Sequence, residues 1–489
     1  MKPRGLSKSK LLSSLQCAKR LWLEVHRPDL LEHSAAAERR FAIGHNVGDV
    51  ARQLEPRGVL IGSDKNLTQA LAETQDQLKS GMKVLFEPTF QHDGVLVRAD
   101  VLTVGRAGVR INEVKASTEV KPYHISDAAI QAWVVEQSGL KVDSIAIQHI
   151  DTRFVYPGDG KYEGLFARVP VNREIKPLVK QVPKWISAAR DTLDGPEPRI
   201  EMGKHCTDPY PCPFTDRCES LAPQTEFPLR LLPNAGKTML GLIAEGYRDL
   251  KDIPEGRLSS ERQERVRRAH VNDAVEFDPA VKKIMRRFDY PRAFLDFETI
   301  NFAIPIWKGV RPYQQIAFQW SLHVEGPRAR TQHREFLDLS GNLPADPLLR
   351  ALLEALPDDG PIFAYGASFE KSCLGTLADL VPTRRRKVER VQARIVDLLK
   401  PTRDHYYHPD MHGSWSLKAV LPTIPGGKDY SDLEEVREAG AAQLAFAEAI
   451  LPSTTPARKG ALRDALLEYC KRDTEALVVL SRYLQGRAS

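Results

Sequence analysis

The pattern of apolar and polar residues predicts an α/β module in the N-terminal part of the chain. Helical spacing of apolar residues runs over 9–24 and again over 35–54. Short apolar runs follow, separated by turn residues such as His92-Asp93-Gly94, and these indicate strands. The expected elements are strands over 84–90, 95–104 and 109–114, a helix over 126–137 and a strand over 142–150.

A second α/β module is expected from residue 291 onward, after a Pro-rich stretch at 221–233 and a charged, helical stretch at 234–287. Within the latter, Gly246 to Pro254 weakly resembles a helix-hairpin-helix element, the alternative being a plain helical linker. We therefore expect domains at 1–222 and 289–489, joined by a linker at 223–288. The expected elements of the second module are strands over 292–297, 315–324, 330–337 and 361–365 and helices over 369–380 and 457–484.

Composition fits a globular protein of two or three domains. The 489 residues are 42% hydrophobic and 27% charged, with a formal net charge of +6. No stretch approaches the roughly 20 apolar residues of a membrane span, and no signal core follows the basic N-terminus, so a cytoplasmic location is expected. Basic clusters at 262–268, 286–287 and 384–387 either contact phosphates or are solvated helix faces.

Charged residues stand at strand positions where a buried strand should be apolar. Glu113 and Lys115 are two residues apart and project from one face of a strand, while Asp100 lies in the preceding strand. Two carboxylates and a lysine on one sheet face can bind Mg²⁺ or Mn²⁺ and support phosphodiester hydrolysis. Glu87 either assists there or is an edge residue. The alternative for the whole set is a ladder of surface ion pairs.

The spacing of Asp100, Glu113 and Lys115 resembles the PD-(D/E)XK nuclease motif, and the upstream helix with His45 resembles its RecB-like branch. This resemblance implies a restriction-endonuclease-like fold with His45, Asp100 and Glu113 as metal ligands and Lys115 as a catalytic residue. The family's glutamine-bearing helix is matched at Gln131, which is expected to be catalytic as well. Taken alone, a helical histidine is more often packed or solvated than a ligand.

Six cysteines in a cytoplasmic chain favour metal binding or inert burial over disulfides. Five residues separate Cys206 from Cys212 and again Cys212 from Cys218. Three ligands leave a tetrahedral site short by one, which Cys17 can supply. One cysteine before the nuclease core and three after it resembles the iron-sulfur nucleases of the CRISPR-adaptation and AddB types. The resemblance implies a [4Fe-4S] cluster that staples the module's two ends together. Structural zinc and inert buried cysteines are the alternatives.

The second module also carries acidic residues inside an apolar pattern. Asp296 and Glu298 share one face of a strand, and such a pair repels itself unless a cation lies between. Tyr469 and Asp473 share one face of the last helix.

These positions resemble the first and third motifs of DnaQ-like exonucleases, in the variant with a tyrosine near the attacking water. The resemblance implies an RNase H-like fold in which Asp296, Glu298, Glu370 and Asp473 bind two Mg²⁺ or Mn²⁺ ions and Tyr469 orients the water. Glu370 stands where the family usually has Asp, and Asp397 is its rival. The segment 416–418 is interpreted as scaffold.

The leading hypothesis is a two-site, metal-dependent nuclease acting on single-stranded or duplex DNA ends. The combination of modules resembles a bacterial family that carries a domain of unknown function over its exonuclease half, and the resemblance covers nearly the whole chain. Two alternatives remain open. One is a nucleic-acid-binding subunit in which one nuclease site is degenerate, and the other is an exonuclease that processes RNA.

Overall fold

The computed structural model describes residues 5–31, 35–62, 66–221 and 225–487. The chain forms two compact units: unit 1 comprises 1–222 and 302–313, and unit 2 comprises 223–301 and 314–489. Residues 223–288, expected as a separate linker, thus belong to the same unit as the second α/β region, and 302–313 belong to unit 1. None of the helices in the described ranges combines the length and apolar character needed to cross a bilayer.

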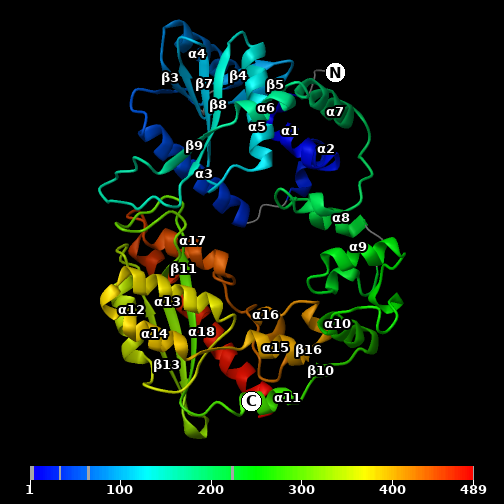
Figure 1. The fold of residues 1–489 in the computed structure, drawn as a ribbon, viewed down its shortest axis with the longest axis vertical. Coiled ribbons are helices and arrows are strands. Elements are labelled where there is room, and N and C mark those ends of the chain that lie inside the picture. Colours follow the sequence, from blue (N-terminus) through cyan, green and yellow to red (C-terminus); the bar gives the residue numbers. More distant parts are fainter. Residues whose placement is uncertain (1–4, 32–34, 63–65, 222–224, 488–489) are drawn as a thin grey trace. The chain divides into compact units, whose positions relative to one another are not determined.

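Unit 1 is a mixed α/β structure (Figure 1). Its main sheet has six strands in the order β2-β3-β6-β7-β8-β9, and a smaller sheet has the order β1-β5-β4. The elements are β1 (Leu6–Ser7), α1 (Lys8–Gln16), α2 (Ala18–His26), α3 (Ala35–Gln53), β2 (Val59–Leu60), α4 (Leu67–Lys79), β3 (Val84–Phe86), β4 (Thr89–His92), β5 (Val95–Arg98), β6 (Val101–Val104), β7 (Val109–Lys115), α5 (Pro122–Gln137), β8 (Val142–Ile150), β9 (Phe166–Pro170), α6 (Asn172–Val179), α7 (Val182–Asp194) and α8 (Thr215–Leu221).

The core of unit 1 explains how β7 presents its charged residues. Val109 and Ile111 of β7 are buried with the apolar residues of α5, because alternate residues of a strand face one side. Glu113 continues that buried row. On the other face, Val114 packs with Val47 and Val50 of α3.

Three features of unit 1 differ from the sequence prediction. The strand predicted over 84–90 is two strands, β3 and β4, which belong to different sheets. The apolar pattern over 9–24 predicted one helix, but the chain breaks at Cys17, which is extended with φ −162° and ψ 121° between α1 and α2. The run over 95–104 is likewise two strands, β5 and β6. Asp100 lies in the break between them and not within a strand.

Unit 2 is built on a five-stranded sheet in the order β13-β12-β11-β14-β15, with a two-stranded sheet β10-β16. Strand β11 is antiparallel to β12 and parallel to β14. The elements are α9 (Gly236–Ala244), α10 (Glu261–Asn272), β10 (Glu276–Phe277), α11 (Ala280–Met285), β11 (Arg292–Ile300), β12 (Ile316–Glu325), β13 (Thr331–Leu337), α12 (Ala345–Ala355), β14 (Ile362–Ala364), α13 (Ser368–Leu380), α14 (Arg385–Ala393), β15 (Ile395–Asp397), α15 (Leu399–His405), β16 (Tyr406–Tyr407), α16 (Leu417–Val420), α17 (Ala439–Ala449) and α18 (Pro456–Leu484).

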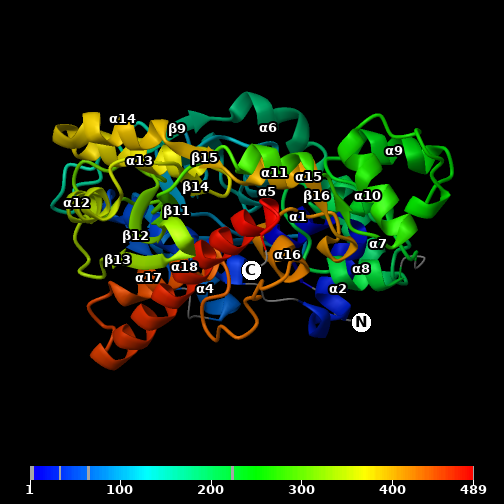
Figure 2. The same ribbon diagram turned by 90° about the horizontal axis from the view of Figure 1, so that it is seen from below.

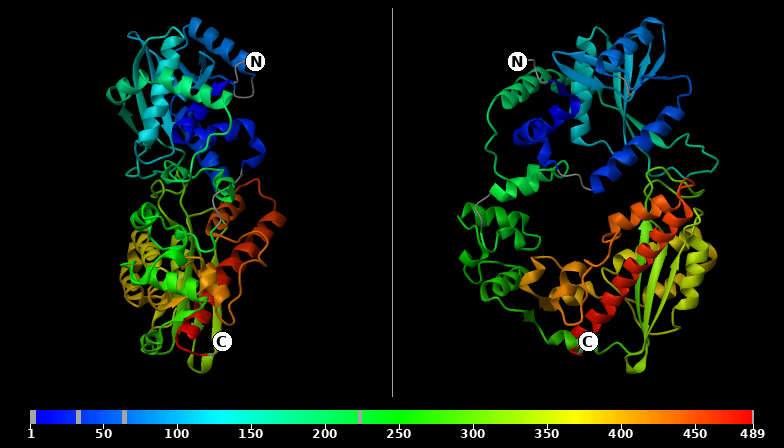
Figure 3. Two further views of the ribbon diagram at one scale, coloured as in Figure 1. Left: turned by 90° about the vertical axis from the view of Figure 1, so that its right-hand side faces the viewer. Right: turned by 180° about the vertical axis from the view of Figure 1, so that it is seen from behind.

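Helices cover both faces of this sheet, with α12, α13 and α14 on one side and α17 and α18 on the other (Figure 2). The long α18 runs across its face (Figure 3). Leu295 and Phe297 of β11 pack into the core formed with α12 to α14. By strand alternation, Asp296 and Glu298 therefore face α18.

The segment after α9 does not form the helix-hairpin-helix that Gly246 to Pro254 suggested. A short 3₁₀ helix, Leu250–Asp252, follows the turn at Gly246, and the next α-helix, α10, begins only at Glu261.

Candidate active sites

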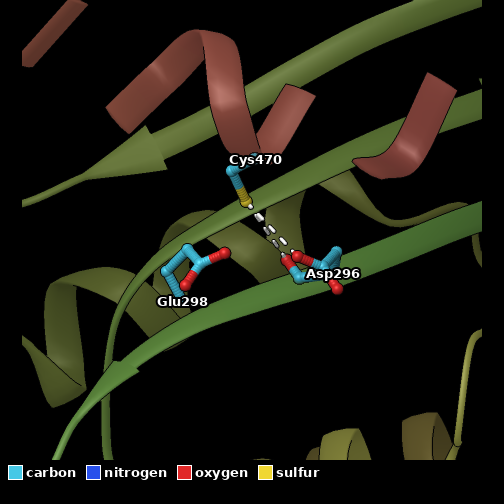
Figure 4. A group of neighbouring side chains, drawn as sticks. All are labelled: Asp296, Glu298 and Cys470. Carbon is cyan, nitrogen blue, oxygen red and sulfur yellow. Dashed lines mark hydrogen bonds between the residues drawn. The ribbon is translucent and has the colours of Figure 1, made fainter. Parts of the chain in front are cut away.

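The acidic centre of unit 2 joins the end of β11 to the middle of α18. One ligand atom each from Asp296, Glu298 and Cys470 lies within 4.8 Å of the other two. The two carboxylates come from β11 and the thiol reaches down from α18 (Figure 4). The pairing of β11 with β12 shifts register between Glu298 and Thr299, an irregularity that re-aims side chains at this point. The predicted acidic pair therefore lies together under α18.

The pKa values of these buried carboxyl groups show that their negative charges destabilise the protein when no cation is bound. Burial raises the pKa of Asp296 well above its ordinary value, and the charges of Asp473, Glu298 and Glu370 raise it further. Burial and Asp473 likewise raise the pKa of Glu298. The pKa of Asp473 is raised to about 6, chiefly by burial. Carboxylates that repel one another in a buried place are the donor set that a divalent cation neutralises, so these residues fit such an ion.

Glu370 and its rival Asp397 have different environments. Glu370, in the first turn of α13, is 2% exposed, and within the described part of the chain its buried Oε2 has no hydrogen-bond partner. Burial, and secondarily Asp397, raise the pKa of Glu370 to about 8. Asp397 Oδ1 instead accepts hydrogen bonds from the backbone N–H groups of Gly366, Ala367 and Leu399. Glu370 thus has a free buried oxygen near Asp296, whereas Asp397 holds the turn before α13.

Tyr469 lies at this centre together with two residues whose role sequence reasoning missed. Tyr430 donates a hydrogen bond to Asp473 Oδ1. Lys418 Nζ lies 5.1 Å from the ring centroid of Tyr430 and 5.2 Å from that of Tyr469. Its charge lowers the pKa of Asp473 and Glu298 against the effect of burial. Lys418 was interpreted as scaffold from the sequence, yet its ammonium group places a positive charge beside Asp473 and Glu298.

Tyr469 is protonated at neutral pH, since burial and the charges of Asp473 and Glu298 raise its pKa. A neutral phenol can donate or orient, but it cannot act as a base.

The lysine–carboxylate cluster of unit 1 surrounds Glu113. Glu113 Oε1 accepts hydrogen bonds from Lys115 Nζ at 2.8 Å and from Lys8 Nζ at 2.7 Å. The same two ammonium groups contact Asp127, Lys115 at 2.6 Å and Lys8 at 3.1 Å. Asp127 and Lys8 were not predicted as site residues.

Asp100 lies one residue beyond the Val101–Asn112 pair of β6 and β7, next to Glu113. Its Oδ2 accepts a hydrogen bond of 2.6 Å from the Val114 N–H. Burial raises its pKa well above the ordinary value, and Glu113 raises it further. Glu113 Oε2 is buried and has no hydrogen-bond partner among the residues that the structure describes, so these two acids also fit a divalent cation.

The other two predicted residues of this site, Gln131 and His45, form no hydrogen bond with Glu113 where the structure describes the chain. Gln131 is fully buried, and its Nε2 donates to Asp127 Oδ1 at 2.9 Å, so it holds Asp127 and through it the two lysines. His45 is exposed on α3 and lines a cavity of about 260 Å³ with Glu87 and Asp100. Glu113 is not among the residues that line this cavity. The structure therefore places His45 and Asp100 at the same cavity.

The four cysteines Cys17, Cys206, Cys212 and Cys218 line one small cavity and are unpaired thiols. Burial raises the pKa of Cys212 and Cys218, and the neighbouring thiols raise it further. Gln16 Nε2, one residue before Cys17, donates to the carbonyls of His205 and Tyr210, each at 2.8 Å. Four sulfur donors around one cavity form a set that fits a soft metal centre.

Comparison with known proteins adds one match. Residues 293–416 match the family model of a domain of unknown function, DUF2779. The match spans β11 to the segment just before α16, so it includes Asp296, Glu298 and Glu370 but not Tyr469 or Asp473. No curated protein matches the chain. Over less than half of its length, then, the chain is similar to DUF2779, whose description carries no activity.

Proposed function

We propose that the protein is a metal-dependent nuclease that hydrolyses phosphodiester bonds at DNA ends and has one active site in each unit. Unit 1 would be a PD-(D/E)XK nuclease of the RecB-like iron-sulfur branch, and unit 2 a DnaQ-like exonuclease with an RNase H-like fold. The observation that carries the proposal is the acidic centre of unit 2, where the ligand atoms of Asp296 and Glu298 lie within 4.8 Å of each other beneath α18.

In unit 2, Asp296, Glu298, Glu370 and Asp473 would hold Mg²⁺ or Mn²⁺. Such ions supply an ionised water and stabilise the negative charge that develops on the transferred phosphoryl group. Tyr469 keeps its hydroxyl proton and orients the attacking water by hydrogen bonding. Tyr430 fixes Asp473. Lys418 provides a positive charge near the phosphate of the bound nucleic acid.

In unit 1, Asp100 and Glu113 would hold the cation, and His45 would reach it from the cavity that it shares with Asp100. Lys115 holds Glu113 and presents an ammonium group to the developing charge. Gln131 holds Asp127, so its contribution is to position the lysines. The four cysteines would hold a [4Fe-4S] cluster, which closes the long loop from Cys17 to Cys206 and so stabilises unit 1.

End-labelled single-stranded and duplex DNA, incubated with Mn²⁺ and the full-length chain, tests the proposal. Asp296→Ala and Glu113→Ala should each remove part of the cleavage, and the double variant should remove all of it. Asp464→Ala is the matched control, since Asp464 is an 81% exposed carboxylate on the same helix as Asp473. If the double variant cleaves as well as the parent, the nuclease proposal fails and a strand-binding role is favoured. RNA of the same sequence, offered in parallel, distinguishes the RNA-processing alternative.

A further inference from the structure

Lys8 is the first residue of α1 and reaches the cluster around Glu113 from a distant part of the sequence. Its Nζ lies 2.7 Å from Glu113 Oε1 and 3.1 Å from Asp127 Oδ1, and its side chain is 17% exposed. The ammonium group of Lys8 thus lies between the carboxylates of Glu113 and Asp127.

The two lysines share a single oxygen of Glu113. Lys8 and Lys115 both donate to Oε1, which leaves the buried Oε2 without a hydrogen-bond partner. This arrangement fixes the Glu113 carboxylate in one orientation and keeps one oxygen available. Without Lys8, Glu113 Oε1 would accept from Lys115 alone, while Asp127 would keep its hydrogen bonds from Lys115 and Gln131.

The other end of α1 lies at the four-cysteine cavity. The helix runs from Lys8 to Gln16, a length of about 13 Å at the usual rise per residue. Cys17 follows it directly and lines the cavity with Cys206, Cys212 and Cys218. Gln16 also anchors this end through its bonds to the carbonyls of His205 and Tyr210. One short helix therefore has the cysteines at one end and Glu113 at the other.

We infer that Lys8 is a positioning residue of the unit 1 site and that α1 couples this site to the four-cysteine cavity. The inference rests on the proposed nuclease function of unit 1. When the cysteines hold a metal centre, Cys17 is fixed and α1 presents Lys8 to Glu113. When they do not, Cys17 is released. The C-terminal half of α1 then keeps the Gln16 bonds, the hydrogen bond from Ser13 to Glu24 and the packing of Leu11 in the core, so Lys8 is presented to Glu113 less rigidly.

The test uses the full-length chain with Asp473→Ala, so that only unit 1 cleaves. In this background Lys8→Met and Lys8→Gln are compared with Lys10→Met, whose lysine lies on the same helix and donates to the Gly5 carbonyl. Cleavage of end-labelled DNA with Mn²⁺ is resolved into kcat and KM. Both Lys8 variants should lower kcat by about 10-fold or more with KM changed less than about 3-fold, and Lys10→Met should match the parent.

Coupling is tested with Cys17→Ser and with the double variant Lys8→Met/Cys17→Ser. Amide hydrogen exchange over 8–16 gives a readout that does not depend on activity. Cys17→Ser should speed exchange in α1 by about 10-fold or more, and the double variant should lose little more activity than the worse single variant. Additive losses, or unchanged exchange in α1, would overturn the coupling.

The two proposals fail in different ways. If Glu113→Ala abolishes cleavage while both Lys8 variants retain the parent's kcat, the positioning role of Lys8 is wrong and the nuclease function stands. If Glu113→Ala itself cleaves like the parent, the nuclease function of unit 1 is wrong. Thermal unfolding of each variant identifies those that fold, and Lys8→Gln keeps one donor in case Lys8→Met does not.

Discussion

Cys470 Sγ lies 3.7 Å from Asp296 Oδ2, although 174 positions separate the two residues in the chain. Burial, and then the charge of Asp296, raise the pKa of Cys470 well above its ordinary value, so the thiol keeps its proton. The protonated thiol is therefore a weak donor to Asp296. Hard cations prefer the carboxylate oxygens that lie beside it.

This relationship predicts that Cys470→Ala changes the Mn²⁺ concentration for half-maximal cleavage by less than about 3-fold, because the sulfur contributes no metal bond. A metal titration of the cleavage rate checks it, with Asp296→Ala as the variant expected to abolish unit 2 cleavage. A loss of 100-fold or more in Cys470→Ala would make the thiol a ligand and contradict this account.

Asp296→Asn should stabilise the protein when divalent cations are removed. The folded-state pKa of Asp296 is raised by burial and by Asp473 and Glu298, so folding free energy is lost as the pH rises from the ordinary Asp value, 3.8, towards the folded-state pKa. In EDTA at pH 8 we expect the unfolding free energy to increase by about 1–2 kcal/mol, measured by denaturant titration. Asp464→Asn, an exposed carboxylate on α18, should change it by less than about 0.5 kcal/mol. A destabilised Asp296→Asn protein would mean that the acid is not under electrostatic strain.

Substitutions at Glu370 and Asp397 should affect different properties, the first the rate of cleavage and the second the stability of the fold. Glu370→Gln keeps the size of the side chain but removes the charge, and we expect it to lower unit 2 cleavage by about 100-fold with little loss of stability. Asp397→Ala leaves three backbone N–H groups without their acceptor and should lower the unfolding free energy by about 1–3 kcal/mol. Cleavage rates and urea midpoints of the two variants check this. The reverse pattern would make Asp397 the third metal ligand.

The local pattern of apolar and polar residues predicted most helices and strands. It failed where contacts between residues far apart in the sequence decide the structure. Strand 142–150 has the predicted bounds, and the terminal helix begins one residue earlier than predicted, since both are long and strongly periodic. The break at Cys17 was missed because the apolar spacing of 9–24 continues through it.

The site residues that were missed are those that arrive from far along the chain. Lys8 lies 105 positions from Glu113, and Tyr430 lies 43 from Asp473, so no spacing rule connects them. The sequence did hold one indication of the role of Lys8. A lysine in the first turn of a helix opposes the helix dipole, and such a local conflict often marks a functional site. Asp127 could have been found from its spacing, since it lies four residues before Gln131 and therefore on the same face of α5.

His323 should make stability depend on pH. Its ring is buried, stacked on His333 at 4.5 Å and hydrogen-bonded through Nδ1 to Thr474. Burial, with the charges of His333 and Lys471, lowers its pKa from 6.5 to about 3. Between these values the unfolded chain binds the proton and the folded protein does not, so stability is retained above pH 6.5 and lost as the pH falls.

The expected contribution of His323 is a loss of up to about 2 kcal/mol between pH 7 and pH 5. It is measured as the pH dependence of the difference in unfolding free energy between the parent and His323→Asn. A difference that stays constant over this range would show that His323 accepts a proton in the folded protein.

The account depends on buried carboxylates that need divalent cations in both units, and Mn²⁺ binding to the cation-free protein tests this most directly. Electron paramagnetic resonance titration counts the bound ions. The account predicts binding to the parent protein, partial loss in Asp296→Asn and in Glu113→Gln, and complete loss when the two changes are combined. Binding of equal stoichiometry and affinity in the parent and the combined variant would contradict it.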